Sequence, residues 1–128
     1  MLKKMAAMLV LCTLAACTEN NPTDTVTLEQ ARAEHESGKV VLIDIREKPE
    51  HLTGVAQGAV LLPMSELAQK QSQIPKDSTQ PVLLICNTQN RSKATFDMLK
   101  QQGYKNVRYV EGGMSQWAAK GWPLVAPR

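Results

Sequence analysis

The sequence predicts an α/β domain with a mainly parallel central sheet that is flanked by helices. Val82 to Ile85 is a run of consecutive aliphatic residues without polar alternation, which is typical of a strand buried on both faces. Similar short runs alternate with segments of helical periodicity along the chain. The 128 residues are enough for one ordinary domain. Ligands of such sheets bind outside the carboxyl ends of the strands, so a functional site is expected there.

The composition narrows the classes of partner. The formal net charge of +3 is too small to indicate a nucleic-acid-binding surface, so no nucleic-acid partner is expected. His35 and His51 are the only histidines, and neither has a cysteine or carboxylate at a spacing typical of metal ligands. We therefore expect no metal site.

The amino-terminal residues are typical of a cleaved bacterial signal peptide. Residues 1–16 begin with the positive charges Lys3 and Lys4, and an apolar stretch too short to span a bilayer follows. Leu14-Ala15-Ala16-Cys17 resembles a lipobox, which predicts cleavage before Cys17 and a lipid on its sulfur. The alternative is an ordinary secretory signal cleaved nearby, which would leave a soluble periplasmic protein with Cys17 as a free thiol.

A lipid on Cys17 would hold the protein on the periplasmic side of a bacterial membrane. Thr18, rather than aspartate, follows this cysteine, which resembles the pattern sorted to the outer membrane. Residues 17–25 are polar and are predicted to form a flexible tether. The globular domain is expected over residues 26–128, as a monomer whose contact with the membrane is the lipid.

The order of the predicted elements follows from local signals. Thr27 and Gln30 fit a helix-capping pair, and glycine or proline residues end most of the segments. The expected elements are a helix from Thr27 to Gly38, a strand over 40–45, a loop over 47–58, a strand over 59–62, a helix over 64–71, a loop over 75–81, a strand ending at Cys86, a helix from Arg91 to Gly103, a strand over 106–110, a Gly112-Gly113 turn and a helix over 114–120.

Asp44 and Arg46 lie at the end of the first predicted long strand. Residues two apart on an extended chain point to the same face, so the carboxylate and the guanidinium are expected to meet. Either this pair fixes the loops around the site by hydrogen bonds, or it is an exposed ion pair of little energetic value.

Cys86 is the last residue of the central apolar run, and a polar loop after it leads into a helix. Unpaired amides and the positive end of the helix dipole favour an anion there, such as a thiolate or a persulfide. Of the three cysteines, Cys12 lies in the predicted signal peptide and Cys17 would carry a lipid, so Cys86 is the free thiol expected in the mature chain. The alternative for a lone cysteine is a small buried apolar residue.

Four segments stand in an order and spacing that are hard to obtain by chance. They are Asp44-Ile45-Arg46, Gly58-Ala59 leading to Leu62-Pro63, the loop from Cys86 to Arg91, and Val110-Glu111-Gly112-Gly113 followed by Trp117. Over about residues 26 to 125 the chain resembles the single-domain rhodanese, or thiosulfate sulfurtransferase, family, and within it the small exported members of the periplasmic phage-shock type. The resemblance implies a three-layer rhodanese-like fold.

The resemblance also implies a sulfurtransferase that needs no metal or organic cofactor. Such enzymes take a sulfane sulfur from a small sulfur-containing anion, such as thiosulfate, and pass it from a cysteine persulfide to a thiophilic acceptor, such as cyanide or a thiol. On this resemblance Cys86 is the nucleophile and Arg91 attracts the anionic donor. The cradle for the transferred sulfur would be the backbone amides of Asn87, Thr88, Gln89, Asn90, Arg91 and Ser92.

Three positions depart from the family pattern. Gln89 stands where the loop commonly has glycine, so either Gln89 adopts a positive φ or the cradle differs in shape. Asn87 stands where thiosulfate-using members often have arginine, so one positive charge is missing. Val55 to Ala59 replaces the usual His-Ile-Pro-Gly-Ala segment. The first two differences predict weak thiosulfate activity or another sulfur donor.

Two other functions are compatible with this loop. A cysteine followed by an arginine also marks phosphatases and arsenate reductases, but the phosphatases of this fold use a loop one residue longer than the six residues from Cys86 to Arg91. The other alternative is a non-catalytic rhodanese-like module that carries sulfur or binds a partner. Inactive members usually lack the cysteine, so the presence of both Cys86 and Arg91 favours an enzyme.

Overall fold

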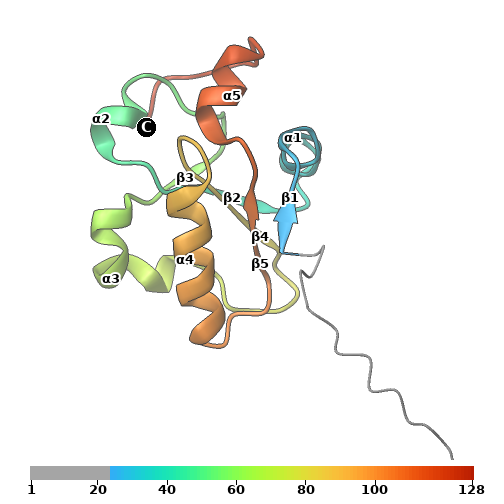
Figure 1. The fold of residues 1–128 in the computed structure, drawn as a ribbon, viewed down its shortest axis with the longest axis vertical. Helices are drawn as coiled ribbons and strands as arrows, with labels where there is room; N and C mark the ends of the chain where they lie inside the picture. Colours follow the sequence, from blue (N-terminus) through green and yellow to red (C-terminus); the bar gives the residue numbers. More distant parts are fainter. Residues whose placement is uncertain (1–23) are drawn as a thin grey trace, which may run out of the picture.

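The computed structural model describes residues 24–128 (Figure 1). The predicted signal peptide, the lipidation site Cys17 and the tether up to residue 23 lie outside the described residues. Within residues 24–128, no helix is both long and apolar enough to cross a membrane.

Five strands form one sheet in the order β1-β5-β4-β2-β3, and every neighbouring pair is parallel. This arrangement confirms the predicted α/β class. The strands are β1 (Thr25–Val26), β2 (Val41–Asp44), β3 (Val60–Leu61), β4 (Val82–Ile85) and β5 (Val107–Val110). Thr25, which the sequence placed at the end of the tether, is the first residue of β1. Asp44 is in register with Ile85, so the carboxyl ends of β2 and β4 lie side by side.

Helices cover both faces of the sheet, and each face has its own apolar core. The helices are α1 (Leu28–Glu36), α2 (Lys48–His51), α3 (Leu67–Lys70), α4 (Asn90–Gln101) and α5 (Gly113–Ala119), with the 3-10 helices η1 (Met64–Glu66) and η2 (Gln71–Gln73) on either side of α3. Leu83 belongs to the core that includes Trp117 of α5, whereas its neighbour Leu84 belongs to the core that includes Phe96 of α4. Because side chains alternate along β4, this strand contributes to both cores and the domain has three layers.

The structure differs from the sequence prediction in the segment after β2. Residues 47–58 were expected as a loop, but they contain α2, whose four residues follow directly from the cap residue Glu47. Glu47 and Glu50 form a reciprocal capping box, and a proline lies in the first turn. The helix expected over 64–71 is a succession of η1, α3 and η2 that ends at Gln73. Figure 1 shows that α2 and the amino-terminal end of α4 lie at the same end of the domain.

Candidate active site

Cys86 directly follows β4, the central strand of the sheet, and is only 1% exposed. Its Sγ lies 3.4 Å from the backbone nitrogen of Ser92, which donates to it, and 3.4 Å from Ser92 Oγ, which accepts from the thiol. Ser92 Oγ in turn donates to the carbonyl of Gln89 at 3.0 Å. Ser92 therefore fixes the sulfur against the first turn of α4.

The loop after Cys86 has backbone amides that make no hydrogen bond within residues 24–128. Asn87, Thr88, Gln89 and Asn90 are exposed, and Arg91 is half-buried. Within residues 24–128, no acceptor receives a hydrogen bond from the backbone amides of residues 87–91. Amides in this state are suited to bind an anion that enters the loop.

Helix α5 determines how this loop is oriented. The amide of Met114 donates to the carbonyl of Cys86 at 2.8 Å, and the amide of Ser115 donates to the carbonyl of Asn87 at 3.0 Å. Because the N–H and C=O of a trans peptide point in opposite directions, the amides of Asn87 and Thr88 point away from α5. The first turn of α5 thus turns both amides toward the side on which a ligand can enter.

Gly113 allows this close approach. Its φ is +54°, and a Cβ there would overlap with backbone atoms of Cys86, Asn87 and Thr88. The sequence indicated only a tight turn at Gly112-Gly113. The structure shows that Gly113 also supports the loop.

Gln89 does not adopt a positive φ, which rules out the first of the two alternatives for this position. Its φ is −152° and its ψ is −9°, and every positive φ among the described residues belongs to a glycine. Gln89 is the N-cap residue of α4, and its carbonyl accepts from the amide of Lys93 at 2.9 Å. Helix α4 therefore begins at Asn90, one residue before the expected Arg91, and the conformation needs no glycine.

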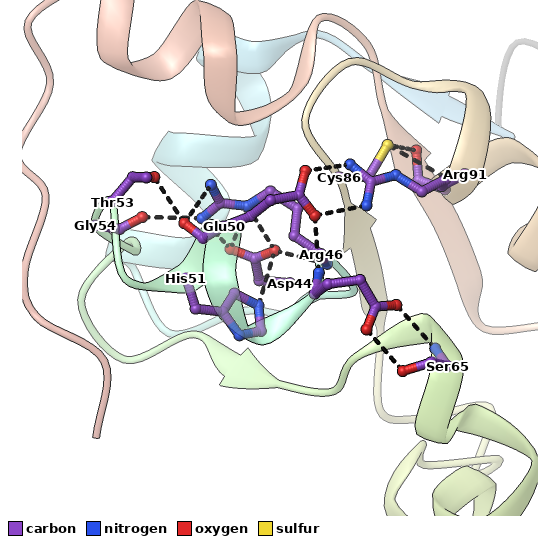
Figure 2. A network of polar contacts seen from close by, with 11 residues as sticks. Asp44, Arg46, Glu50, His51, Thr53, Gly54, Ser65, Cys86 and Arg91 are labelled. Atoms are coloured by element: carbon purple, nitrogen blue, oxygen red, sulfur yellow. Dashed lines mark hydrogen bonds and ion pairs between the residues drawn. The ribbon is translucent and has the colours of Figure 1, made fainter.

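Arg91 forms a two-pronged ion pair with Glu50 of α2 (Figure 2). The Nη1 to Oε2 distance is 2.7 Å and the Nη2 to Oε1 distance is 2.6 Å. The hydrogen bonds from Arg91 lower the pKa of Glu50 from 4.5 to about 2, and the hydrogen bonds to Glu50 raise the pKa of Arg91. Glu50 is not among the site residues predicted from the sequence. The signal that could have indicated it is the spacing of Glu47 and Glu50 around Pro49, which is typical of a capped helix start.

Asp44 and Arg46 form a buried ion pair that fixes the loop after β2, so the alternative of an exposed pair is wrong. Their exposed fractions are 0% and 3%, and Arg46 Nη2 lies 2.7 Å from Asp44 Oδ2. The same guanidinium donates to the carbonyls of Gly54, at 2.9 Å, and Glu50, at 3.4 Å. His51 Nε2 also lies 3.4 Å from Asp44 Oδ1. This network holds α2 in place beside the loop of Cys86 (Figure 2).

Lys93, Trp117 and Trp122 make contacts that belong to the fold rather than to the site. Lys93 forms an exposed ion pair with Asp97 at 2.9 Å. Trp117 packs edge-on against Trp122 and donates from Nε1 to the carbonyl of Pro123 at 3.0 Å. Both tryptophans thus contribute to packing.

Comparisons with known proteins agree with this architecture. A model of the family described as the rhodanese-like domain matches residues 27–120. A curated protein from Allochromatium vinosum that is named sulfurtransferase is 38% identical over 107 residues, which are 84% of this chain and 96% of that protein.

Solved structures of other proteins have a similar fold. A rhodanese-related protein from Thermoplasma volcanium superposes with a TM-score of 0.71 at 28% identity, covering 80% of this chain and 98% of that one. A protein of unknown function from Rhodopseudomonas palustris, described as a possible tyrosine phosphatase, gives a TM-score of 0.67 at 26% identity over 80% of this chain and 84% of that one. Since the family model covers most of the sequence, this chain belongs to the rhodanese-like domain family.

Proposed function

We propose that this protein is a sulfurtransferase that carries a sulfane sulfur as a persulfide on Cys86. The donor is thiosulfate or a similar small sulfur compound, and the acceptor is a thiol or cyanide. The observation that carries the proposal is the position of Cys86 Sγ, which accepts from the amide of Ser92 and lies at the start of the six-residue loop from Cys86 to Arg91. Within residues 24–128, the amides of residues 87–91 have no partner. The sulfurtransferase from Allochromatium vinosum supports the same reaction class.

The proposed reaction has two displacement steps. The Cys86 thiolate attacks the outer sulfur of thiosulfate, the S–S bond of the donor breaks, and sulfite leaves with the electron pair. An acceptor thiolate or cyanide then attacks the outer sulfur of the persulfide, and the Cys86 thiolate leaves. The amides of residues 87–92 would hold the negative charge of the transferred sulfur in both steps.

Mass spectrometry tests the first step. After incubation of the purified protein with a sulfane donor, we expect a mass increase of about 32 Da, the mass of one sulfur atom, that a thiol reductant removes. Cys86→Ser is expected to show no increase. If wild-type protein gains no sulfur from thiosulfate or from a thiol persulfide, the proposal is wrong and a partner-binding module without sulfur chemistry takes its place.

Turnover separates an enzyme from a carrier. An enzyme releases many equivalents of product from thiosulfate and cyanide, whereas a non-catalytic carrier releases at most one equivalent for each Cys86. We expect multiple turnovers, lost in Cys86→Ser. A single equivalent would leave sulfur carriage as the function.

Phosphatase activity is the second candidate, because one structural neighbour is described as a possible tyrosine phosphatase. The short loop from Cys86 to Arg91 argues against it, and so does the carboxylate of Glu50, which occupies both terminal nitrogens of Arg91. We expect no hydrolysis of p-nitrophenyl phosphate. If the protein hydrolyses this ester and Cys86→Ser abolishes the hydrolysis, the assignment of sulfur transfer as the only activity is wrong.

We also propose that the mature protein is a monomeric lipoprotein anchored through Cys17 on the periplasmic side of the outer membrane. The proposal is supported by the lipobox-like Leu14-Ala15-Ala16-Cys17 segment followed by Thr18. Membrane fractionation of a bacterial host that expresses the full chain should place wild type with the outer membrane. The variant Cys17→Ser should lose the lipid mass, and an unchanged mass would contradict the anchor.

A further inference from the structure

We infer that Glu50 makes the site selective for donors without an oxyanion, namely thiol persulfides, and selects against thiosulfate. The inference rests on the proposed sulfur transfer through Cys86 and adds the chemical class of the donor. It also gives a function to Glu50, which the sequence pattern did not indicate.

The geometry of the Arg91–Glu50 pair is the first observation. Both terminal nitrogens of Arg91 donate to the two carboxylate oxygens of Glu50, at 2.7 Å and 2.6 Å. This fork is the same part of the guanidinium that would pair with the oxygens of a sulfonate or sulfite group. A thiosulfate dianion must therefore compete with a carboxylate that belongs to the protein.

The carboxylate of Glu50 is held in place independently of Arg91, which is the second observation. The amide of Glu47 donates to Glu50 Oε2 at 2.9 Å, and Arg46 donates to the carbonyl of Glu50 at 3.4 Å. Glu47 is itself anchored, because its carboxylate accepts from the amide and the hydroxyl of Ser65 at 3.0 Å and 2.6 Å. The position of the Glu50 carboxylate is thus set by contacts within the protein and does not depend on a bound donor (Figure 2).

The charge balance of the loop is the third observation. Arg91 is the only charged residue between Cys86 and Ser92, and Glu50 neutralises it. Lys93, the next residue after the loop, forms an ion pair with Asp97. The cation that would attract a dianion and stabilise the departing sulfite is therefore already compensated.

A thiol persulfide avoids this requirement. The Cys86 thiolate attacks the outer sulfur of R–S–SH, the S–S bond of the donor breaks, and R–S⁻ leaves with the electron pair and takes up a proton from water. The products are the Cys86 hydropersulfide and the free thiol. This reaction places one sulfur in the amide cradle and needs no cation for an oxyanion leaving group.

Loading of Cys86 from two probe donors tests the inference. The donors are thiosulfate and the persulfide of 2-mercaptoethanol, whose only acidic group besides the alcohol is the reacting sulfur. The readout is the rate of the mass increase of about 32 Da on wild type, Glu50→Gln and Glu34→Gln. Glutamine keeps an oxygen that can accept from the Glu47 amide, so α2 retains its cap. Glu34 is the matched control, because it pairs with Arg108 at 2.9 Å with a similar exposure and does not touch the loop.

We expect wild type to load faster from the persulfide than from thiosulfate. Glu50→Gln should raise the thiosulfate rate relative to the persulfide rate by about fivefold or more, whereas Glu34→Gln should leave this ratio unchanged. The gain should disappear in Glu50→Gln combined with Arg91→Gln, because it depends on the released guanidinium. Glu50→Asp, whose shorter side chain loosens the pair, should give a smaller gain and serves as the second variant if Glu50→Gln does not fold.

Two results would overturn the inference while leaving sulfur transfer intact. One is a wild type that loads faster from thiosulfate than from the persulfide. The other is an unchanged ratio of the thiosulfate loading rate to the persulfide loading rate in both Glu50→Gln and Glu50→Asp, provided that Cys86 gains sulfur in both variants. If wild type gains no sulfur from either donor, the proposed function fails and the inference fails with it.

Discussion

The backbone amide of Met114 donates a 2.8 Å hydrogen bond to the carbonyl oxygen of Cys86. This contact joins the first turn of α5 to the end of β4, and it directs the following amide toward the ligand side of the loop. The geometry of the candidate site therefore depends on a helix that supplies no reactive group. Gly113 makes the contact possible, because only a residue without a Cβ can lie so close to the loop.

Replacing Gly113 with alanine should disrupt the loop. We expect Gly113→Ala to lower the free energy of unfolding by about 2–4 kcal/mol, through overlap with the loop backbone and strain at positive φ, and to abolish persulfide formation. Gly121→Ala is the control, because Gly121 also has a positive φ but has open space around it. That variant should lose only about 1 kcal/mol and keep the activity. Equal effects of the two variants in urea unfolding and sulfur loading would contradict this explanation.

The hydroxyl of Ser92 is expected to affect the rate of persulfide formation more than the free energy of unfolding. Ser92→Ala keeps the backbone amide that donates to Cys86 Sγ but removes the hydroxyl that lies 3.4 Å from this sulfur and donates to Gln89. We expect persulfide formation to slow on the order of tenfold, with a loss of about 1 kcal/mol in unfolding free energy. Stopped reactions analysed by mass spectrometry give the rate. Ser115→Ala, which removes an exposed hydroxyl but keeps the amide that supports the loop, should react like wild type.

The sequence predicts the parts of this site that rest on local patterns. The uninterrupted aliphatic residues of β4 place Cys86 at the carboxyl end of a buried strand, and the spacing of Asp44 and Arg46 predicts their pairing. Both predictions depend on residues that are close together in the chain. The role of Arg91 in attracting an anionic donor came from the family resemblance, which does not indicate that a carboxylate of the protein pairs with it.

The features of the site that the sequence did not predict depend mainly on contacts between distant segments of the chain. Glu50 and Arg91 are separated by 41 positions, and the loop-supporting role of Gly113 appears only when α5 packs on the loop. A positive φ at Gln89 was one of two alternatives drawn from the family's glycine pattern, but this residue serves as the N-cap of α4 with a φ of −152° and a ψ of −9°. A short helix such as α2 is also hard to predict, because four residues show no apolar periodicity.

Breaking the buried Asp44–Arg46 ion pair, which holds α2 in place, should destabilise the domain strongly. In Asp44→Asn the guanidinium of Arg46 stays buried without a compensating charge, so we expect a loss of about 3–5 kcal/mol in the free energy of unfolding. Asp97→Asn removes one partner of the exposed pair with Lys93 and should cost less than about 1 kcal/mol. Urea denaturation of both variants measures the two values. A small loss in Asp44→Asn would mean that backbone packing alone positions α2.

The pKa of Glu50 predicts a defined pH dependence of stability. Its pKa in the folded protein is lowered to about 2, mainly by hydrogen bonds from Arg91, so the ionised carboxylate favours the folded state. This contribution is fully present above a pH of about 4.5 and is lost as the pH falls toward about 2. Because both side chains are 34% exposed, we expect solvent screening to reduce it to about 1 kcal/mol.

The difference in unfolding free energy between wild type and Glu50→Gln isolates this contribution from that of the other carboxyl groups. It should favour wild type at neutral pH and shrink as the pH falls from about 4.5 toward 2. Urea titrations at a series of pH values give the difference. A difference that stays constant across this range would show that the pair contributes nothing through ionisation.

The strand order determines which parts of the chain must be in place before the loop of Cys86 can accept sulfur. Strand β4 lies between β2, which precedes it in the chain, and β5, which follows it, and β1 completes the far edge next to β5. The support of the Cys86 loop likewise comes from α2 on one side of the sequence and from α5 on the other. All of these pairings join segments that are distant in the chain. Sulfur loading of Cys86 through the amides of its loop is therefore a chemical report that the chain from β1 to α5 has folded.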